Sequence, residues 1–324
     1  MAAQTGKIRR EGDKMSDLKY VIIGAGGTGG ILGFYMTKAG KDVTLIARGH
    51  HLKSIQENGL TVEKMWDNTE ENVTVKAADM QHFIERKEKA DVILVCVKGY
   101  SLDDTYDFIK QISNENTVVI PVLNIYGTGA KMQEKLQGML VTDGCIYVSA
   151  NIKSPGVLIQ HGKILRVVYG VRNKSEYRPV LSEIKQDFDE SGIDGVLTEH
   201  IQRDALEKFS YVSPAGAAGL YYDAVASDFQ KEGAAREMLK GMMNEIAALA
   251  AAMGYPFDKD MVEVNLKIMS TLAPDSTTSM QRDVMAGKKS EADGLIFEVV
   301  RLGKKYNVPV PYYEKAAKKF EGKL

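Results

Sequence analysis

The first half of the chain alternates continuous apolar segments with segments of helical spacing, and this alternation constrains the fold more than any other feature. Four apolar segments have the length of a strand: YVIIGAG, DVTLIAR, ADVILVCVK and NTVVIPVLN. Such runs suit parallel strands that are buried on both faces. The segments between them, such as GGILGFYMTKAG and SLDDTYDFIKQI, carry the spacing of helices. We therefore expect an α/β fold that begins with a doubly wound parallel sheet.

The pattern changes in the second half. The first part is completed by two more strand regions, MLVTDGCIYVSAN and GVLIQHGKILRVVYG, the second with a glycine typical of a hairpin. After about Thr198 apolar residues recur at helical spacing, as in the stripe Met238, Met242, Ile246, Leu249 and Met253. The stripe stops at Gly254, a candidate C′ residue, and it predicts core packing and not a cofactor site. We expect one domain over residues 16–198 and an all-α domain over residues 199–324.

The composition is that of a soluble two-domain protein. At 324 residues the chain is long for one domain, and hydrophobic residues at 44% with charged residues at 26% allow a sizeable core. Forty-two basic and 43 acidic residues give a net charge of -1, which argues against nucleic acid and anionic membranes as partners. The absence of an apolar run of 18 residues predicts no membrane span.

The cysteines and histidines indicate no metal site. Cys96 and Cys145 lie in separate apolar runs, which suits reduced thiols in the cytoplasm. The five histidines form no ligand cluster, and we expect His50 and His51 on the surface beside Arg48. Residues 1–15 lack the apolar segment of a secretory signal, and we interpret them as a disordered extension or an expression remnant. The sequence allows a homodimer and does not decide the oligomeric state.

A glycine-rich turn follows the first predicted strand and opens the first predicted helix. In VIIGAGGTGG, Gly24, Gly26 and Gly29 have the spacing G-x-G-x-x-G. The spacing alone is weak, but this context is the one that the dinucleotide fingerprint of a Rossmann domain requires. Gly24 would permit the tight turn, Gly26 the approach of a pyrophosphate, and Gly29 close packing of helix and strand. The alternative is a structural βα turn without a ligand.

The end of the second predicted strand distinguishes NADP from NAD. NAD enzymes usually place an acid there for the ribose hydroxyls, whereas this chain has Ala47 and Arg48. A guanidinium suits the 2′-phosphate of NADPH, and an exposed surface arginine is the alternative. Lys98 follows the apolar run VILVCV at the carboxyl edge of the sheet. It would add positive charge near the cofactor, or lie solvated in a loop.

Two parts of the second half hold further candidates. Lys208 lies on an apolar helical stripe, where it either snorkels to the surface, as periodicity favours, or is held in a pocket as a proton donor. In TTSMQRDVMAGKKSEADG, Gly287 is a candidate C′ residue, and Ser290 with Asp293 fits a capping box. These assignments leave Ser279 and Glu291 without a structural role.

Taken together, these motifs resemble the ketopantoate reductase (2-dehydropantoate 2-reductase) family, whose members join a Rossmann domain to an all-α domain. The resemblance runs from about Leu18 to Tyr313 and includes GAGGTGG, VTLIARG, VCVKGYSL, PVLN, SPGVLIQHG and DALEKFSYV. The segment from Thr277 onward is the most specific part, because its serine, methionine, aspartate and glutamate recur at the family's intervals.

The resemblance implies roles for four residues. Lys208 matches the family's catalytic lysine. Asn124, which could otherwise be a turn residue, matches its active-site asparagine and would help place the nicotinamide of the cofactor and the substrate. Glu291 matches the acid that engages the polar end of the substrate, and Ser279 a hydroxyl donor to its carboxylate. The competing interpretation of Glu291 is an acid favoured by a helix dipole.

Two positions depart from the family pattern. Val212 stands where the family usually has asparagine, and Ile125 stands where it usually has glycine. We expect an NADPH-dependent reductase of a small 2-oxo acid, with ketopantoate as the leading substrate. A different 2-oxo acid or related carbonyl compound, and a regulatory NADP(H)-binding protein without turnover, are the alternatives. The joint presence of Lys208 and Glu291 argues against the last of these.

Overall fold

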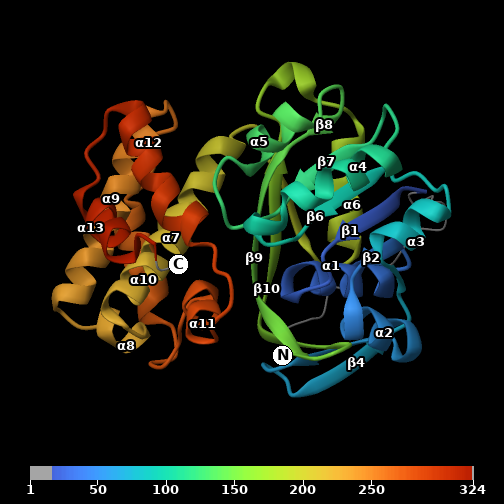
Figure 1. The fold of residues 1–324 in the computed structure, drawn as a ribbon, viewed down its shortest axis with the longest axis horizontal. Coiled ribbons are helices and arrows are strands. Elements are labelled where there is room, and N and C mark those ends of the chain that lie inside the picture. The colour runs from blue at the N-terminus through green and yellow to red at the C-terminus, as the bar shows by residue number, and fades with distance from the viewer. Residues whose placement is uncertain (1–16, 323–324) are drawn as a thin grey trace, which may run out of the picture.

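The structure, a computed structural model, describes residues 17–322 and has two parts side by side (Figure 1). The first part contains both sheets, and the second part is helical. The expected disordered extension, residues 1–15, lies outside the described residues. The strands end at Leu197 and the next helix begins at Ile201, so our boundary between residues 198 and 199 falls in the connection.

The first sheet has six parallel strands in the order β5-β2-β1-β6-β7-β8. Its strands are β1 (Lys19–Ile23), β2 (Asp42–Ile46), β5 (Lys76–Ala78), β6 (Val92–Val95), β7 (Val118–Pro121) and β8 (Leu140–Val141). All residues of β6 and β7 are buried, as continuous apolar runs in a covered parallel sheet predict. The doubly wound sheet is therefore confirmed.

A second sheet completes the first part and lies on the side that faces the helical part (Figure 1). It has the order β11-β10-β3-β4, with β9 paired to β10. Its strands are β3 (Leu60–Lys64), β4 (Thr69–Val73), β9 (Asp143–Ser154), β10 (Val157–Gly170) and β11 (Asp194–Leu197). Gly162 is not the turn of a hairpin, because β10 continues through it with an irregular register. The turn between β9 and β10 includes Gly156, which has φ +78°.

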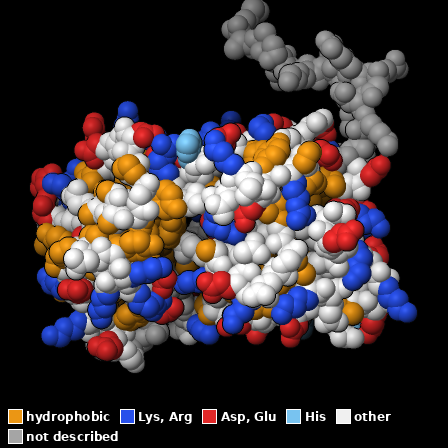
Figure 2. Space-filling model, turned by 90° about the horizontal axis from the view of Figure 1, so that it is seen from above, with side chains coloured by type: hydrophobic (Ala, Val, Ile, Leu, Met, Phe, Trp, Pro, Cys, Tyr) orange, Lys and Arg blue, Asp and Glu red, His pale blue; other side chains and the backbone are white. Residues whose placement is uncertain are grey.

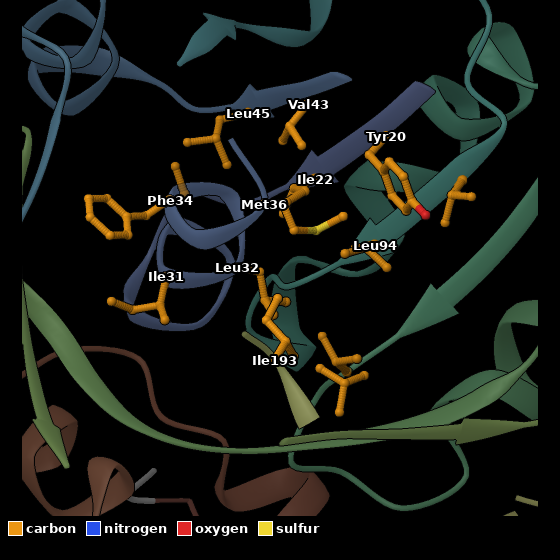
Figure 3. Close-up of a cluster of buried hydrophobic side chains, with 14 of the residues drawn as sticks. Tyr20, Ile22, Ile31, Leu32, Phe34, Met36, Val43, Leu45, Leu94 and Ile193 are labelled. Atoms are coloured by element: carbon orange, nitrogen blue, oxygen red, sulfur yellow. The ribbon is translucent and has the colours of Figure 1, made fainter. Parts of the chain in front are cut away.

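Helices cover the first sheet on both sides. They are α1 (Gly27–Lys38), α2 (Gly49–Asn58), α3 (Met80–Glu85), α4 (Tyr106–Ile112), α5 (Thr128–Lys135) and α6 (Val180–Glu190). Short 3₁₀ turns occur at Gly99–Ser101, Asp103–Thr105 and Lys174–Glu176. Figure 3 shows the core on one side, where Ile31, Leu32, Phe34 and Met36 of α1 lie among strand side chains such as Val43 and Leu45. This packing fixes α1 and hence the glycine turn that precedes it.

The second part contains α7 (Ile201–Tyr222), α8 (Ala226–Phe229), α9 (Ala234–Ala252), α10 (Met261–Ser270), α11 (Ser279–Met285), a π-helical segment (Asp293–Phe297), α12 (Glu298–Tyr306) and α13 (Pro311–Phe320). The methionine stripe lies on α9 and packs into the helical core. Gly254 follows the C-cap with φ +87°, so the predicted C′ glycine is confirmed. On the face in Figure 2 acidic and basic side chains are interspersed, and hydrophobic ones gather over the helical part.

The segment from Thr277 to Gly294 is partly as predicted. Gly287 follows α11 with φ +64° and is the expected C′ residue. The capping box predicted for Ser290 and Asp293 is wrong, because the Asp293 carboxylate binds Arg301 instead. A capping box does form at the start of α11, between Thr278 and Gln281.

Candidate active site

The glycine turn has the geometry of a phosphate-binding loop. Gly24 has φ +100°, and a Cβ there would stand 2.9 Å from the carbonyl oxygen of Cys96. A Cβ on Gly29 would stand 1.9 Å from the carbonyl oxygen of Gly24, so α1 packs closely on the turn. Gly26 differs, because a Cβ there would meet nothing within 4 Å and no side chain caps α1. The open N-terminus of α1 thus fits the pyrophosphate of a dinucleotide.

Arg48 stands at the same edge of the sheet. It follows β2, which pairs directly with β1, and its side chain is exposed at the start of α2. In doubly wound sheets, the residue at this position contacts the ribose of the adenosine end. A guanidinium there is placed to receive a phosphate with charge-assisted hydrogen bonds.

His51 is not the surface residue that we expected. Its ring is half-buried, and Nε2 lies 2.8 Å from the carbonyl oxygen of Ala25. The N–H of Gly156 donates to Nδ1 at 3.0 Å, which assigns the hydrogen of a neutral ring to Nε2. His51 therefore ties the glycine turn to the β9–β10 turn. The sequence did not reveal this role because the two contacts join segments that are distant along the chain.

Lys208 is held in the protein and does not snorkel. Its residue is 8% exposed, and Nζ donates to Oδ1 of Asn124 at 2.7 Å. The ammonium lies 5.6 Å from the centre of the Tyr147 ring on β9, which cation–π attraction favours. Burial lowers the pKa of Lys208 below its ordinary value, while Cys145 and Glu291 act in the opposite direction. An ammonium with a lowered pKa releases its proton more readily, as a general acid requires.

A small cavity of about 20 Å³ lies beside Lys208 and Asn124. Asp143 and Cys145 contribute to its wall on the side of the sheet. Since a cavity of this size holds about one water molecule, it is too small for a 2-oxo acid. A substrate would therefore have to approach Lys208 from outside this cavity.

Glu291 lies at the contact between the two parts of the molecule. Its residue is 5% exposed, and Oε1 accepts a hydrogen bond from the N–H of Gly99 at 3.1 Å. Oε2 lies 3.1 Å from Nζ of Lys98, which also lies 2.9 Å from Oδ2 of Asp283 on α11. The sequence placed Lys98 at the edge of the sheet but did not reveal that its ammonium pairs with two carboxylates of the helical part.

Ile125 fills the space between two glycines. A Cβ on Gly99 would stand 2.2 Å from Cδ1 of Ile125, and a Cβ on Gly294 would stand 2.5 Å from the same atom. Gly99 belongs to the first part and Gly294 to the second, so Ile125 packs where the parts meet. Because neither Gly99 nor Gly294 has a side chain, there is room for isoleucine at position 125, where the family usually has glycine.

Ser279 and Val212 are placed by their helices. Ser279 is the first residue of α11, with a half-buried side chain. It lies four residues before Asp283, so both side chains share one face of the helix, the face that meets Lys98. Val212 lies one turn after Lys208 on α7 and packs against the helical core. An apolar side chain there offers no hydrogen bond to a ligand.

Residues 17–322 show no group of three metal-ligating side chains that could bind an ion. Within the same residues, no helix combines the length and the apolar character that crossing a membrane requires.

Comparison with known proteins adds independent information. Residues 20–174 match the family described as "Ketopantoate reductase PanE/ApbA", and residues 200–323 match its C-terminal counterpart. The 2-dehydropantoate 2-reductase of Pyrococcus horikoshii is 25% identical over 300 residues, which cover 91% of this chain and 93% of that protein.

Solved structures share the fold. The 2-dehydropantoate 2-reductase of Methylococcus capsulatus superimposes with a TM-score of 0.82 at 21% identity, covering 94% of this chain and 96% of that one. A D-mandelate dehydrogenase in a ternary structure with NADH and anilino(oxo)acetate gives a TM-score of 0.80 at 20% identity, covering 93% and 96%. Both likenesses extend over the two parts of the molecule.

Proposed function

Because the chain belongs to the ketopantoate reductase family, a family of oxidoreductases, we propose that it reduces a small 2-oxo acid to a 2-hydroxy acid with NADPH. The leading substrate is 2-dehydropantoate (ketopantoate), the compound named in the relative from P. horikoshii. The observation that carries the proposal is the buried Lys208 ammonium, bonded to Asn124 at 2.7 Å at the carboxyl end of β7.

The first part would hold the cofactor. Gly24, Gly26 and Gly29 leave the N-terminus of α1 open for its pyrophosphate, and Arg48 would bind the 2′-phosphate. Lys98 uses two of its three ammonium hydrogens on Asp283 and Glu291, which leaves one for an oxygen of the cofactor. When bound, NADPH supplies the hydride for the carbonyl carbon.

The second part would hold the substrate and supply the proton. Lys208 would donate a proton to the oxygen of the developing alkoxide, where electrostatic stabilisation has its largest effect. Asn124 accepts a hydrogen bond from Lys208 and would orient the ammonium. Glu291 and Ser279 would bind the polar groups of the substrate.

A different 2-oxo acid is the second candidate. Val212 is apolar where the family usually has asparagine, which favours a substrate with fewer polar groups. The NADH in the D-mandelate dehydrogenase structure also makes NADH the cofactor to compare.

A cytoplasmic location stays an expectation from the cysteine content. A homodimer likewise stays an expectation.

A panel of 2-oxo acids, monitored by NADPH absorbance, tests the proposal. We expect turnover with at least one 2-oxo acid and the highest kcat/KM with ketopantoate. A better substrate with an apolar side chain would favour the second candidate. Tight binding of NADPH without turnover of any 2-oxo acid would instead indicate the regulatory alternative.

A further inference from the structure

The loop after β6 and the segment that carries Glu291 meet around one ammonium group. Nζ of Lys98 lies 2.9 Å from Oδ2 of Asp283 and 3.1 Å from Oε2 of Glu291. The next residue, Gly99, donates its N–H to Oε1 of Glu291 at 3.1 Å. Both oxygens of Glu291 are thus bound to the first part of the molecule. Asp283 has no role in the proposed reaction.

The two carboxylates differ in their access to water. The side chain of Glu291 is 4% exposed, whereas that of Asp283 is 23% exposed and that of Lys98 is 38% exposed. A carboxylate buried as deeply as Glu291 cannot exchange a lost partner for water without a large cost. Asp283 can replace a lost partner with water, because its side chain is partly exposed. Glu291 therefore needs another partner whenever it releases Lys98.

Lys98 also stays charged in this position. Burial alone would lower its pKa, but the charges of Glu291 and Asp283 and their hydrogen bonds raise it above the ordinary value. If Asp283 were neutral, Glu291 would be the only carboxylate in contact with this ammonium among the described residues. The ammonium would then be free to lie closer to Glu291, and the attraction between the two groups would increase as their distance shortens.

We propose that Asp283 is a positioning residue: it retains Lys98 while Glu291 exchanges its bond with Lys98 for a bond with the substrate. This inference rests on the proposed function, in which Glu291 binds a polar group of the 2-oxo acid. The exchange needs no large movement, because Lys98 keeps one carboxylate throughout. Glu291 also keeps its bond to Gly99 through the other oxygen.

The variant Asp283→Asn tests this role, because it removes the charge and keeps the shape. KM for the best 2-oxo acid should rise about three- to tenfold, because Lys98 then binds Glu291 more tightly and the substrate competes less well for this carboxylate. Turnover at saturation and NADPH affinity should change little. Adding Lys98→Met to Asp283→Asn should return KM to the value of Lys98→Met alone, because no ammonium remains to hold Glu291.

Asp293→Asn is the matched control. It removes the same charge from the same segment, two residues beyond Glu291, but Asp293 binds Arg301 and not Lys98. Its KM should equal that of the unmodified protein. If Asp283→Asn leaves KM unchanged, or if Lys98→Met does not reverse its effect, Asp283 is only a structural contact and the inference is wrong.

A measurement without substrate separates this inference from the proposed function. If the unmodified protein reduces no 2-oxo acid, the proposed function has failed, and the contact itself can still be examined by urea unfolding. A double-mutant cycle of Lys98→Met and Glu291→Gln gives the coupling energy between the two side chains in the free energy of unfolding. This coupling energy should be larger when Asp283→Asn is also present than when Asp283 is unchanged. Equal coupling in the two backgrounds would contradict the inference in either case.

Discussion

Lysines 98 and 208 belong to the two parts that meet at the candidate site, and their surroundings shift their pKa values in opposite directions. Lys98, on the first part, lies within 3.1 Å of two carboxylates, which overcome the effect of burial and raise its pKa. Lys208, on the helical part, is bonded to the neutral Asn124, and burial lowers its pKa. The comparison shows that the nearest opposite charge, and not burial alone, decides how readily a lysine releases its proton.

The largest expected effect would separate the two lysines by function. Lys208→Ala should lower turnover by roughly 10²–10⁴, the range for loss of a general acid, while NADPH affinity stays nearly intact. Lys98→Met should lower turnover far less, because it removes a contact and not the proton donor. Steady-state kinetics and a cofactor titration check both variants. Near-normal turnover of Lys208→Ala would mean that the proton comes from another group.

The pH profile sharpens the same comparison. Lys208 must be protonated to act, so activity should fall as the pH rises through its folded pKa, which lies below the ordinary value of 10.5. Small amines added to Lys208→Ala should restore part of the rate, and the basic limb that belongs to the lysine should be absent from that variant. A basic limb unchanged in Lys208→Ala would assign it to another group.

The next effect concerns the cofactor side of the site. Arg48→Ala should weaken NADPH binding by about 1.5–3 kcal/mol and NADH binding much less, because only NADPH offers a 2′-phosphate for a charge-assisted bond. Fluorescence titration with both cofactors measures this difference. Equal affinity of the unmodified protein for NADPH and NADH would contradict the assignment of Arg48.

A smaller effect is expected at the substrate side. Ser279→Ala should raise KM about three- to tenfold with little change in melting temperature, since the hydroxyl begins a short helix and fills no core. Glu291→Gln should also raise KM, and in addition lower stability by about 1–3 kcal/mol, because Glu291 is buried and bonded to Lys98 and Gly99. Unchanged kinetics in both variants would leave these residues with a structural role only.

The last effect is on stability and not on kinetics, and it extends the comparison to a buried acid away from the site. Glu245 accepts hydrogen bonds from the N–H groups of Tyr312 and Tyr313. Burial raises the pKa of Glu245 from 4.5 to about 7, against the opposing effect of these bonds. The folded chain then binds the proton more tightly than the unfolded chain. The free energy of unfolding should therefore fall by about 1–3 kcal/mol as the pH rises from 4.5, the ordinary pKa, to about 7, the pKa in the folded chain.

Glu245→Gln tests this sign, because it cannot titrate. Urea unfolding across the pH range should show that the variant lacks the decrease seen in the unmodified protein. A stability that is flat in both proteins would mean that the two backbone N–H groups keep Glu245 ionised throughout.

The sequence by itself determined the parallel sheet, the methionine stripe and the helix end at Gly287. These features depend on the periodicity of apolar residues and on backbone preferences within a few residues, which a single sequence displays directly. The glycine turn was also recognisable, since its three glycines serve one local geometry. The capping box at Ser290 was wrong, because Arg301 competes for Asp293 from the next helix.

Only the tertiary structure decided the state of the site. Whether Lys208 snorkels or is held depends on Asn124, and the surroundings of Lys98 depend on Asp283, 185 residues further along the chain. His51 is tied to Gly156 in the same manner. The partner of a charged or polar side chain is chosen by which distant segments pack together, and a local pattern holds no record of that choice.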